Sequence, residues 1–250
     1  MRLILSPQKF LKLLSTTLLY SGSKGIFHEM LLRLTPEGMD CSGNYLGSVL
    51  NRAAFYKSYF DVYEPEDTTE FLASTLLFEQ LKSKFSGEDL IEITTRDDYI
   101  VVEGANEVFR IPMSKPGFTL DPGIPFGLDS SGALVGFLPL GMVPKVQFLI
   151  PASNLRMGGT RLTFSCKPES ITLISIDEKV QSEWRKTIIS KPEDLTKSSS
   201  IDIAFQAEYL DSLTAMFEGA CWVSIDDTAV VLSFADNTMA KSFAQARLLD

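Results

Sequence analysis

The first twenty residues have the pattern of an amphipathic helix. Ser6 can accept a hydrogen bond from the first turn, and Pro7 suits the first helical position because its missing N–H costs nothing there. Apolar residues then recur at helical spacing as far as Tyr20: Phe10, Leu11, Leu14, Leu18 and Leu19. We therefore predict a helix that begins at Pro7 and ends before the Ser- and Gly-rich residues 21–25.

The next forty or so residues change to a strand-like pattern. Apolar residues alternate from Ile26 to Leu34 and stop at the turn Thr35-Pro36-Glu37-Gly38. A short strand around residues 39–41 and the segment 45–51 follow, and residues 53–60 are predicted to form a brief helical stretch.

One strand–helix–hairpin order occurs twice along the chain. The first copy comprises a strand (69–74), a helix (76–85) and three strands (90–95, 99–103 and 107–113). The second comprises a strand (200–205), a helix (207–217) and two strands (221–225 and 229–234). A constant spacing aligns Leu81 with Leu213, Phe85 with Phe217, Gly87 with Gly219, and Ile93 with Ile225. This repetition predicts two similar domains.

A Pro- and Gly-rich segment separates the two copies. It contains Phe118, Leu120, Ile124 and Phe126, so we expect it to lie against the protein surface. We predict domains at residues 1–113 and 133–250, joined by a connecting loop at 114–132. The second domain is mostly strand (133–138, 146–150, 160–166, 170–176 and 184–189), and residues 190–199 form a polar loop.

Composition indicates a globular chain outside the membrane. The 250 residues are 45 % hydrophobic and 22 % charged, and no uninterrupted apolar stretch reaches the roughly 20 residues that a span requires. Lys9 and Lys12 interrupt the apolar N-terminus, which also lacks a small-x-small cleavage site, so we do not interpret it as a signal peptide. With 23 basic and 32 acidic residues the net charge is −9, and bulk charge alone disfavours nucleic acid.

No motif of an enzyme or a metal site is present. The chain has one histidine, His28, and three widely spaced cysteines, of which Cys41 is interpreted as buried and structural. The pairs Asp97-Asp98 and Asp226-Asp227 fall in equivalent hairpin turns, where Asp is favoured for local hydrogen bonding. We therefore expect no enzyme activity, no metal and no cofactor.

Lysines are concentrated on the two predicted helices of the first half. Residues 7–19 carry Lys9 and Lys12 and no acid, and residues 76–85 carry Lys82 and Lys84 against one Glu79. If these helices share a face, an acidic protein presents a local cationic surface to phosphates. The alternative is that the lysines only solvate the helices.

The order of elements resembles that of sliding clamps of the proliferating-cell-nuclear-antigen (PCNA) family, in a divergent archaeal or viral form. The segment Leu34-Thr-Pro-Glu-Gly-Met-Asp-Cys-Ser42 resembles the family's "A-M-D-x-S" region, with Gly38-Met39-Asp40 contracted relative to the usual spacing. The segment Glu107-Val-Phe-Arg-Ile-Pro112 resembles the "F-R-[VI]-P" that precedes the family's linker.

The resemblance implies an α+β fold of two similar clamp domains, each with antiparallel sheets outside and helices lining an inner face. It implies a trimeric ring, homomeric or with paralogues, that encircles duplex DNA independently of sequence. By position, the DNA-facing residues would be Lys9, Lys12, Lys82, Lys84, Lys145 and Arg156. The pocket for a partner peptide would comprise Met39, Leu46, Leu120, Ile124 and Phe126.

The resemblance also implies the partners, which are a DNA polymerase, a clamp loader, and a nuclease or ligase that carries a clamp-binding peptide. It implies an intracellular protein, cytoplasmic in a prokaryote or archaeon and nuclear in a eukaryote.

The sequence departs from the family's pattern at two points. The helix 207–217 has acids and no lysine, and the third lining helix is either residues 143–156 or a stub at 151–156 after a strand. Two alternatives stay open: a β-rich ligand-binding or scaffolding protein without a DNA role, and a hydrolase built from scattered carboxylates.

Overall fold

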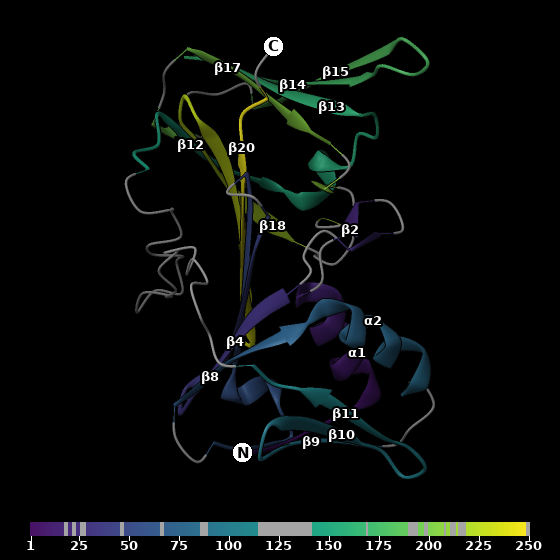
Figure 1. Cartoon of the computed structure of the whole chain (residues 1–250). Coiled ribbons are helices and arrows are strands. Elements are labelled where there is room, and N and C mark those ends of the chain that lie inside the picture. The colour runs from purple at the N-terminus through teal and green to yellow at the C-terminus, as the bar shows by residue number, and fades with distance from the viewer. Residues whose placement is uncertain are drawn as a thin grey trace.

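The computed structural model describes residues 1–17, 20–21, 24–25, 29–45, 48–65, 68–85, 90–114, 142–168, 170–189, 195–197, 200–207, 209–210, 214 and 219–248. The chain forms an elongated molecule of antiparallel sheets, with the two termini towards opposite ends (Figure 1). The described helical elements are α1 (Pro7–Thr17), η1 (Lys57–Tyr59, a 3-10 helix), α2 (Thr75–Lys84) and η2 (Ala152–Leu155, a 3-10 helix).

The first half of the chain contributes two groups of strands. One is a five-stranded sheet of order β11-β10-β9-β1-β7, and the other is a run of order β6-β5-β4-β8. The strands are β1 (Arg2–Leu5), β4 (Glu29–Thr35), β5 (Gly38–Tyr45), β6 (Val49–Tyr56), β7 (Val62–Glu64), β8 (Thr69–Ser74), β9 (Ile91–Arg96), β10 (Tyr99–Glu103) and β11 (Val108–Pro112), with a small separate pair β2 (Tyr20–Ser21) and β3 (Lys24–Gly25).

The second half repeats this arrangement strand for strand. The run β20-β19-β18-β12-β16 matches the five-stranded sheet, and β15-β14-β13-β17 matches the four-stranded run. The strands are β12 (Val146–Pro151), β13 (Arg161–Lys167), β14 (Ser170–Asp177), β15 (Ser182–Ile189), β16 (Leu195–Lys197), β17 (Ile201–Gln206), β18 (Ala220–Ile225), β19 (Ala229–Ala235) and β20 (Met239–Ala246). The predicted internal repeat is therefore confirmed.

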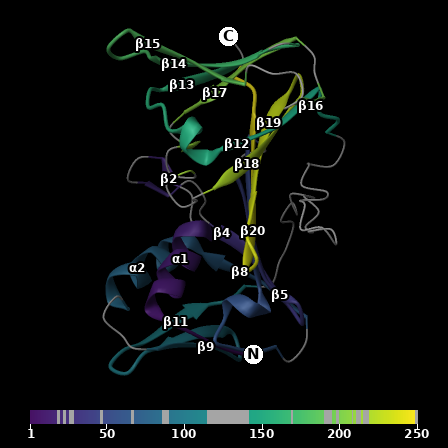
Figure 2. The ribbon, with the colours of Figure 1, turned by 180° about the vertical axis from the view of Figure 1, so that it is seen from behind.

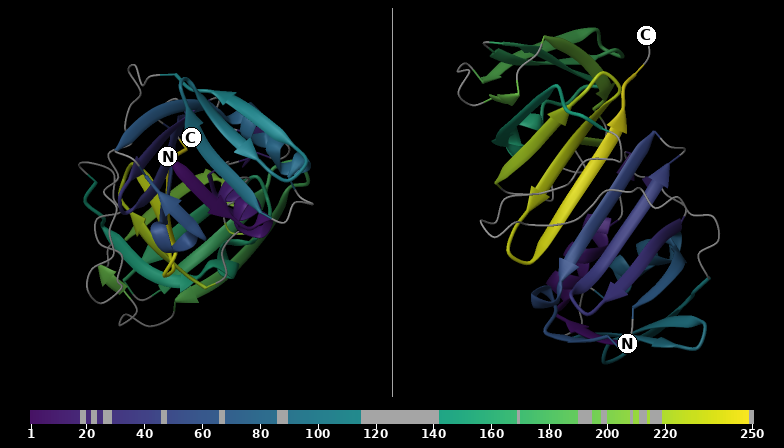
Figure 3. Two further views of the ribbon diagram at one scale, coloured as in Figure 1. Left: turned by 90° about the horizontal axis from the view of Figure 1, so that it is seen from below. Right: turned by 90° about the vertical axis from the view of Figure 1, so that its left-hand side faces the viewer.

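The two halves are joined by strand pairing between β6 and β20. The pairing runs antiparallel from Met239 opposite Phe55 to Gln245 opposite Val49. It merges one run from each half into a continuous nine-stranded sheet (Figure 3, right). The described helices lie on one side of this sheet, as Figures 1 and 2 show from opposite directions.

Helix α1 forms for the reasons that its sequence suggests. The backbone N–H of Lys9 donates to Ser6 Oγ at 3.4 Å, which satisfies one of the free donors of the first turn. Phe10, Leu13 and Leu14 are buried on its inner face. Described helical structure ends at Thr17 rather than Tyr20, and Tyr20 belongs to β2.

The helix predicted over residues 53–60 is wrong. Ala53–Tyr56 continue β6, and only Lys57–Tyr59 form a single 3-10 turn. The two alanines favour a helix by propensity, but tertiary pairing overrides it: Ala53 is paired with Cys41 on one side and Lys241 on the other. The strand around residues 39–41 is also longer than predicted, since β5 extends to Tyr45.

The second half has less described helix than the first. The strand β12 followed by η2 excludes a helix over residues 143–156 and agrees with the shorter stub. Of the helix predicted over 207–217, Tyr209, Leu210 and Thr214 are helical, and most of the rest lies outside the described residues. The predicted strand 133–138 and the connecting loop beyond Ser114 lie outside them as well.

Two strands with structural importance were not expected from the pattern. They are β1, which lies between β9 and β7, and β20, which joins the halves. All of β20 from Met239 to Gln245 is buried, including Lys241 and Gln245. In the part of the chain that the structure describes, no helix is long and apolar enough to cross a membrane.

Candidate functional site

Helices α1 and α2 form one helical surface over the first half of the long sheet. They meet at Phe10 of α1 and at Phe85, the residue that directly follows α2, whose rings pack edge to face with centroids 6.0 Å apart. This contact holds the helices side by side (Figure 1). The structure therefore brings the lysines of the two helices onto neighbouring elements, as the cationic-surface hypothesis requires.

The lysines of α1 are solvent-accessible but have acidic partners. Lys9 Nζ lies 2.6 Å from Asp61 Oδ1, and Lys12 Nζ lies 3.8 Å from Asp236 Oδ2 in the β19–β20 turn. Burial raises the pKa of Asp236, but hydrogen bonds from Thr238 and Met239 and the charge of Lys12 bring it below its usual range. Both pairs are partly exposed, so each contributes little to stability and exchanges readily with other partners.

The lysines of α2 differ from each other. Lys84 Nζ is 3.5 Å from Glu107 Oε2, and both side chains are exposed. Lys82 is half-buried, and this burial lowers its pKa, although the nearby charge of Glu79 raises it in part. Lys84 is therefore the better placed of the two to meet an external anion.

The two predicted cations of the second half lie at opposite ends of one strand. Lys145 precedes β12 and pairs with Asp227 in the β18–β19 turn. Arg156 follows η2, beyond the other end of β12, and donates to the carbonyl of Thr214. Six residues of strand span about 20 Å, so Lys145 and Arg156 do not form one cluster.

Only one member of the predicted peptide pocket lies in the described part of the chain. Met39, on β5, is 7 % exposed and belongs to the hydrophobic core. Leu46, Leu120, Ile124 and Phe126 lie outside the described residues. The partner pocket therefore stays a prediction.

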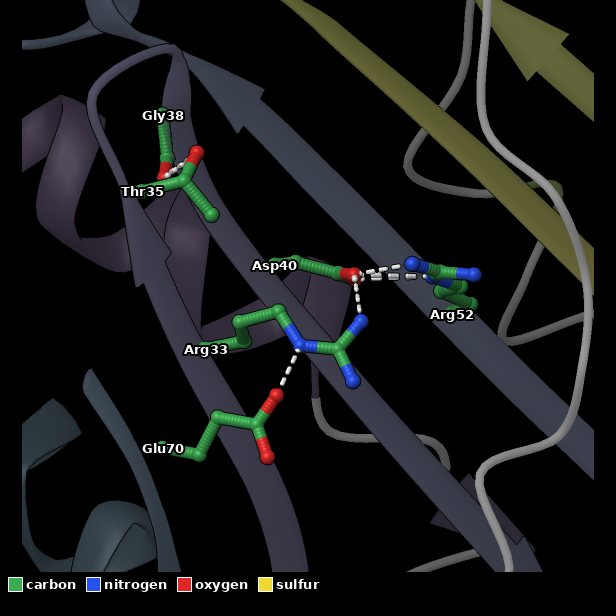
Figure 4. Close-up of polar contacts among 6 residues, drawn as sticks. All are labelled: Arg33, Thr35, Gly38, Asp40, Arg52 and Glu70. Carbon is green, nitrogen blue, oxygen red and sulfur yellow. Dashed lines mark hydrogen bonds and ion pairs between the residues drawn. The ribbon is translucent and has the colours of Figure 1, made fainter. Parts of the chain in front are cut away.

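A hollow of about 600 Å³ opens beside Met39 on the face of the sheet away from α1. Its polar side includes Arg33, Asp40 and Arg52 on three neighbouring strands, and Glu70 on β8, outside the lining, pairs with Arg33 (Figure 4). Arg52 Nε donates to both carboxylate oxygens of Asp40 at 3.0 and 2.9 Å, and Arg33 Nε donates to Glu70 Oε1 at 2.5 Å. Because these charges compensate each other across the strands, the hollow has no strong preference for an anion or a cation.

The described residues offer no constellation for catalysis. They contain no group of three or more His, Cys, Asp or Glu side chains that could hold a metal ion. Cys41, Cys166 and Cys221 are buried free thiols, and burial raises the pKa of each. Asp226 accepts hydrogen bonds from Thr228 and Ala229, which confirms its predicted role in a turn. His28 lies outside the described residues.

The comparison with solved structures gives one consistent result. The chain is similar over its whole length to the structure titled the C-terminal region of FEN-1 bound to A. fulgidus PCNA (10 % identity, TM-score 0.72, covering 100 % of this chain and 98 % of that one). It is similar to a PCNA2–PCNA3 complex from Sulfolobus tokodaii (12 %, 0.69, 99 % of both chains) and to PCNA from Thermococcus kodakaraensis (15 %, 0.70, 99 % of both chains).

These likenesses show the fold of the chain, which is the two-domain α+β fold of PCNA-like sliding clamps. No protein-family model and no curated protein matches the sequence. The resemblance drawn from the order of elements is thus confirmed at the level of the fold.

Sequence reasoning missed the residues that connect the two halves. Lys241 on β20 is fully buried and donates from Nζ to the carbonyl of Thr16 at 2.7 Å. Asn51 on β6 donates from Nδ2 to the carbonyl of Thr17 at 3.1 Å. The sequence of β20 has a single lysine among small and apolar residues. This pattern is as typical of an exposed strand as of a buried one, so it does not reveal that Lys241 is buried.

Proposed function

We propose that this chain is a non-enzymatic DNA sliding clamp, which encircles duplex DNA and tethers other proteins to it. The observation that carries the proposal is the pair of matching sheet units with helices on one side, in a fold similar to archaeal PCNA over the full chain. A repeated unit joined edge to edge is the geometry that extends into a ring when the same contact is made between copies.

In this proposal Lys9, Lys12 and Lys84 face the DNA phosphates, with Lys82, Arg156 and Lys145 in minor or peripheral roles. Each of the first three already has a carboxylate within 4 Å. A phosphate must compete with that carboxylate, so individual contacts are weak. Weak contacts to the backbone alone carry no sequence information and permit movement along the duplex.

The proposed partners are a polymerase, a clamp loader, and a nuclease or ligase that binds through a short peptide. The A. fulgidus structure is titled as a complex of PCNA with the C-terminal region of FEN-1, which supports this mode of binding by analogy. We propose Met39, Leu46, Leu120, Ile124 and Phe126 as the peptide pocket.

We further propose domains at residues 1–113 and 133–250 with a connecting loop at 114–132, and a ring of three chains. Two domains per chain then give a pseudo-six-fold ring. Such a protein acts wherever duplex DNA is replicated or repaired, inside the cell. The Sulfolobus tokodaii structure is titled as a complex of two different PCNA chains, so both homomeric and heteromeric rings are relevant.

A second function, a β-rich binding or scaffolding protein without a DNA role, is favoured by one observation. The hollow of about 600 Å³ beside Met39 is a well-formed site, and binding a ligand there does not require the helices to face DNA. This alternative predicts a monomer that binds a small molecule or peptide there and ignores DNA.

Electron microscopy of the purified protein at micromolar concentration separates the two functions. A clamp appears as a ring of three chains with a central hole wide enough for a DNA duplex. Monomers without a hole, alone and with every paralogue from the same genome, would contradict the proposal.

A further inference from the structure

The outward sides of α1 and α2 carry few charges. The side chains exposed to solvent are Gln8 and Lys12 on α1, and Leu76, Gln80 and Lys84 on α2. Among the described side chains of these two helices, Lys12 and Lys84 are thus the only exposed charges, and Lys9 is partly exposed beside them. Such a surface offers a phosphate few cations, so the partner that each cation already has determines how firmly it can bind.

All three of these lysines share their charge with a carboxylate from another part of the fold. The pairs are Lys9 with Asp61 at 2.6 Å, Lys12 with Asp236 at 3.8 Å, and Lys84 with Glu107 at 3.5 Å. The acids come from the segment after η1, from the β19–β20 turn and from the segment before β11. Helical spacing alone would pair a lysine with an acid three or four residues away on its own helix. These pairs are instead a product of the tertiary structure.

Asp236 is the most firmly held of the three carboxylates. Its Oδ1 accepts hydrogen bonds from Thr238 N and Thr238 Oγ1, both at 2.7 Å, and from Met239 N at 2.9 Å. Its Oδ2 lies towards Lys12 Nζ. Burial raises the pKa of Asp236, but these hydrogen bonds and the charge of Lys12 bring it below its usual range. The carboxylate is therefore charged and fixed in place beside α1.

The other two acids also belong to hydrogen-bonded backbone. Asp61 N donates to Ile4 O at 2.8 Å, and Gly104 N donates to Glu107 O at 2.9 Å. A lysine ammonium, by contrast, lies at the end of a flexible four-carbon stem. When another anion arrives, the lysine can turn towards it while the carboxylate stays behind.

We propose that Asp61, Asp236 and Glu107 are internal competitors of DNA. Each acid holds a lysine of α1 or α2 until a phosphate displaces it, and so keeps the contact between the protein and the duplex weak. The three acids are positioning residues, because they touch the lysines and not the DNA. The inference rests on the proposed function and adds the residues that set the strength of its DNA contact.

The expected size of the effect follows from the exposure of the pairs. Exposed ion pairs are weak, so giving one up lowers the affinity for a phosphate by a factor of roughly 1.5 to 5. In a ring of identical chains the same loss recurs in every copy. Removing one of the acids should therefore strengthen DNA binding, although the acid itself lies outside the contact.

The chain contains a matched control at Asp227. Its carboxylate pairs with Lys145, which precedes β12 and is on neither α1 nor α2. The side chains of this pair and of the Lys12–Asp236 pair are all 45–60 % exposed. Asp227→Asn thus removes the same negative charge from a comparable pair, and it measures the effect of bulk charge alone.

The first experiment measures the affinity of the full-length protein for a short fluorescent duplex at low salt. Asp236→Asn should bind about threefold or more tighter than wild type. Its melting temperature should change little, because the asparagine oxygen still accepts hydrogen bonds from Thr238 and Met239. Asp227→Asn should give a clearly smaller gain. No gain in Asp236→Asn, or equal gains in the two variants, would overturn the inference.

The second experiment asks whether Asp236 acts through its lysine. In a Lys12→Met background the Asp236→Asn change should have no effect on affinity, since no lysine remains to be released. Glu107→Gln and Lys84→Met form a second cycle with the same expectation. A gain of equal size with and without the lysine would show that the acid acts only by general repulsion, which contradicts the proposal.

The third experiment is the salt dependence of the gain. Salt screens the lysine–carboxylate pair as well as the phosphate contact, so competition weakens as the ionic strength rises. The advantage of Asp236→Asn over wild type should shrink between about 50 mM and about 200 mM salt. An advantage that stays constant or grows would contradict an electrostatic competitor.

The outcomes separate this inference from the proposed function. A protein that is trapped on an end-blocked duplex but gains no affinity from Asp236→Asn keeps the clamp and overturns the inference alone. A gain that depends on Lys12, in a protein that is not trapped, supports the competition and overturns the encirclement of DNA. No binding of the duplex by any variant at low salt would overturn both.

Discussion

Lys241 Nζ donates a hydrogen bond to the carbonyl oxygen of Thr16 at 2.7 Å, which ties the last strand of the chain to the last turn of its first helix. The carbonyls at the end of a helix have no partner within the helix, so this bond satisfies one of them. The side-chain amide of Asn51 donates a hydrogen bond to the next free carbonyl, that of Thr17. The end of α1 is therefore held by β6 and β20, the two strands whose pairing joins the halves.

The first prediction concerns the ionisation of Lys241. Burial lowers its pKa to about 7, against about 10.4 in an unfolded chain. Between these values the unfolded chain holds the proton more tightly than the folded chain, so stability increases as the pH rises. From pH 7 to pH 8 the free energy of unfolding of wild type should rise by up to about 1.4 kcal/mol more than that of Lys241→Met. Urea unfolding at the two pH values measures this, and equal slopes would show that Lys241 does not titrate there.

The second prediction concerns the β4–β5 turn. Gly38 has φ +157°, and a Cβ added there would lie 2.1 Å from the carbonyl oxygen of Phe55 on β6. The strands must separate to accept it, so Gly38→Ala should lose about 2–3 kcal/mol of unfolding free energy. Gly158→Ala is the control, because Gly158 also has a positive φ but has open space around its Cα. A smaller loss at position 38 than at position 158 would be inconsistent with the close approach of β5 and β6.

The third prediction concerns the cationic surface. Lys82→Glu/Lys84→Glu should reduce retention on duplex DNA several-fold while leaving the melting temperature almost unchanged, because exposed ion pairs such as Lys84–Glu107 contribute little to stability. Lys179→Glu, in the exposed β14–β15 turn, lowers the net charge by two units, as each single Lys→Glu variant of α2 does, and so controls for the loss of bulk charge when set against each single variant. Equal retention of the helix variants and the turn variant would remove α2 from the DNA-facing surface.

The fourth prediction concerns the thiols. Burial raises the pKa of Cys166 to about 12 and raises the pKa of Cys41 and Cys221 as well. The thiolate is the reactive form, so none of the three should react with a thiol reagent at pH 8 in the native protein. All three should react after unfolding in urea. A rapid native reaction of even one cysteine would mean that its surroundings open in solution.

The elements with local signals were predictable from the sequence. Ser6 and Pro7 indicate where α1 begins. The strand, helix and hairpin of residues 69–103 differ from their predicted bounds by a residue or two at most. These elements have clear hydrophobic periodicity and turn residues, which depend only on near neighbours.

The elements that join the halves were not predictable in this way. In β20, Lys241 and Gln245 occupy buried positions, so the strand lacks the usual alternation of apolar and polar residues. In β6, two adjacent alanines suggest a helix, and only pairing with β5 and β20 holds them extended. Each strand also pairs with the other, almost two hundred positions away, and no local pattern reports that contact.

The candidate site was predictable only in part. The lysines of α1 and α2 do lie on neighbouring helices, but their carboxylate partners could not be foreseen, since Asp61, Asp236 and Glu107 come from other elements. The separation of Lys145 from Arg156 follows from β12, which occupies residues that could also have been helical.

The central claim is that the protein encircles DNA, and topology tests it most directly. The protein is threaded onto a linear duplex that is fixed to a bead at one end, and the free end is then blocked by a bulky protein. After a wash in high salt, which removes phosphate contacts, the account predicts that the protein stays on the blocked duplex and leaves when a restriction enzyme cuts it. Release in high salt with the end still blocked, or retention after the cut, would contradict it.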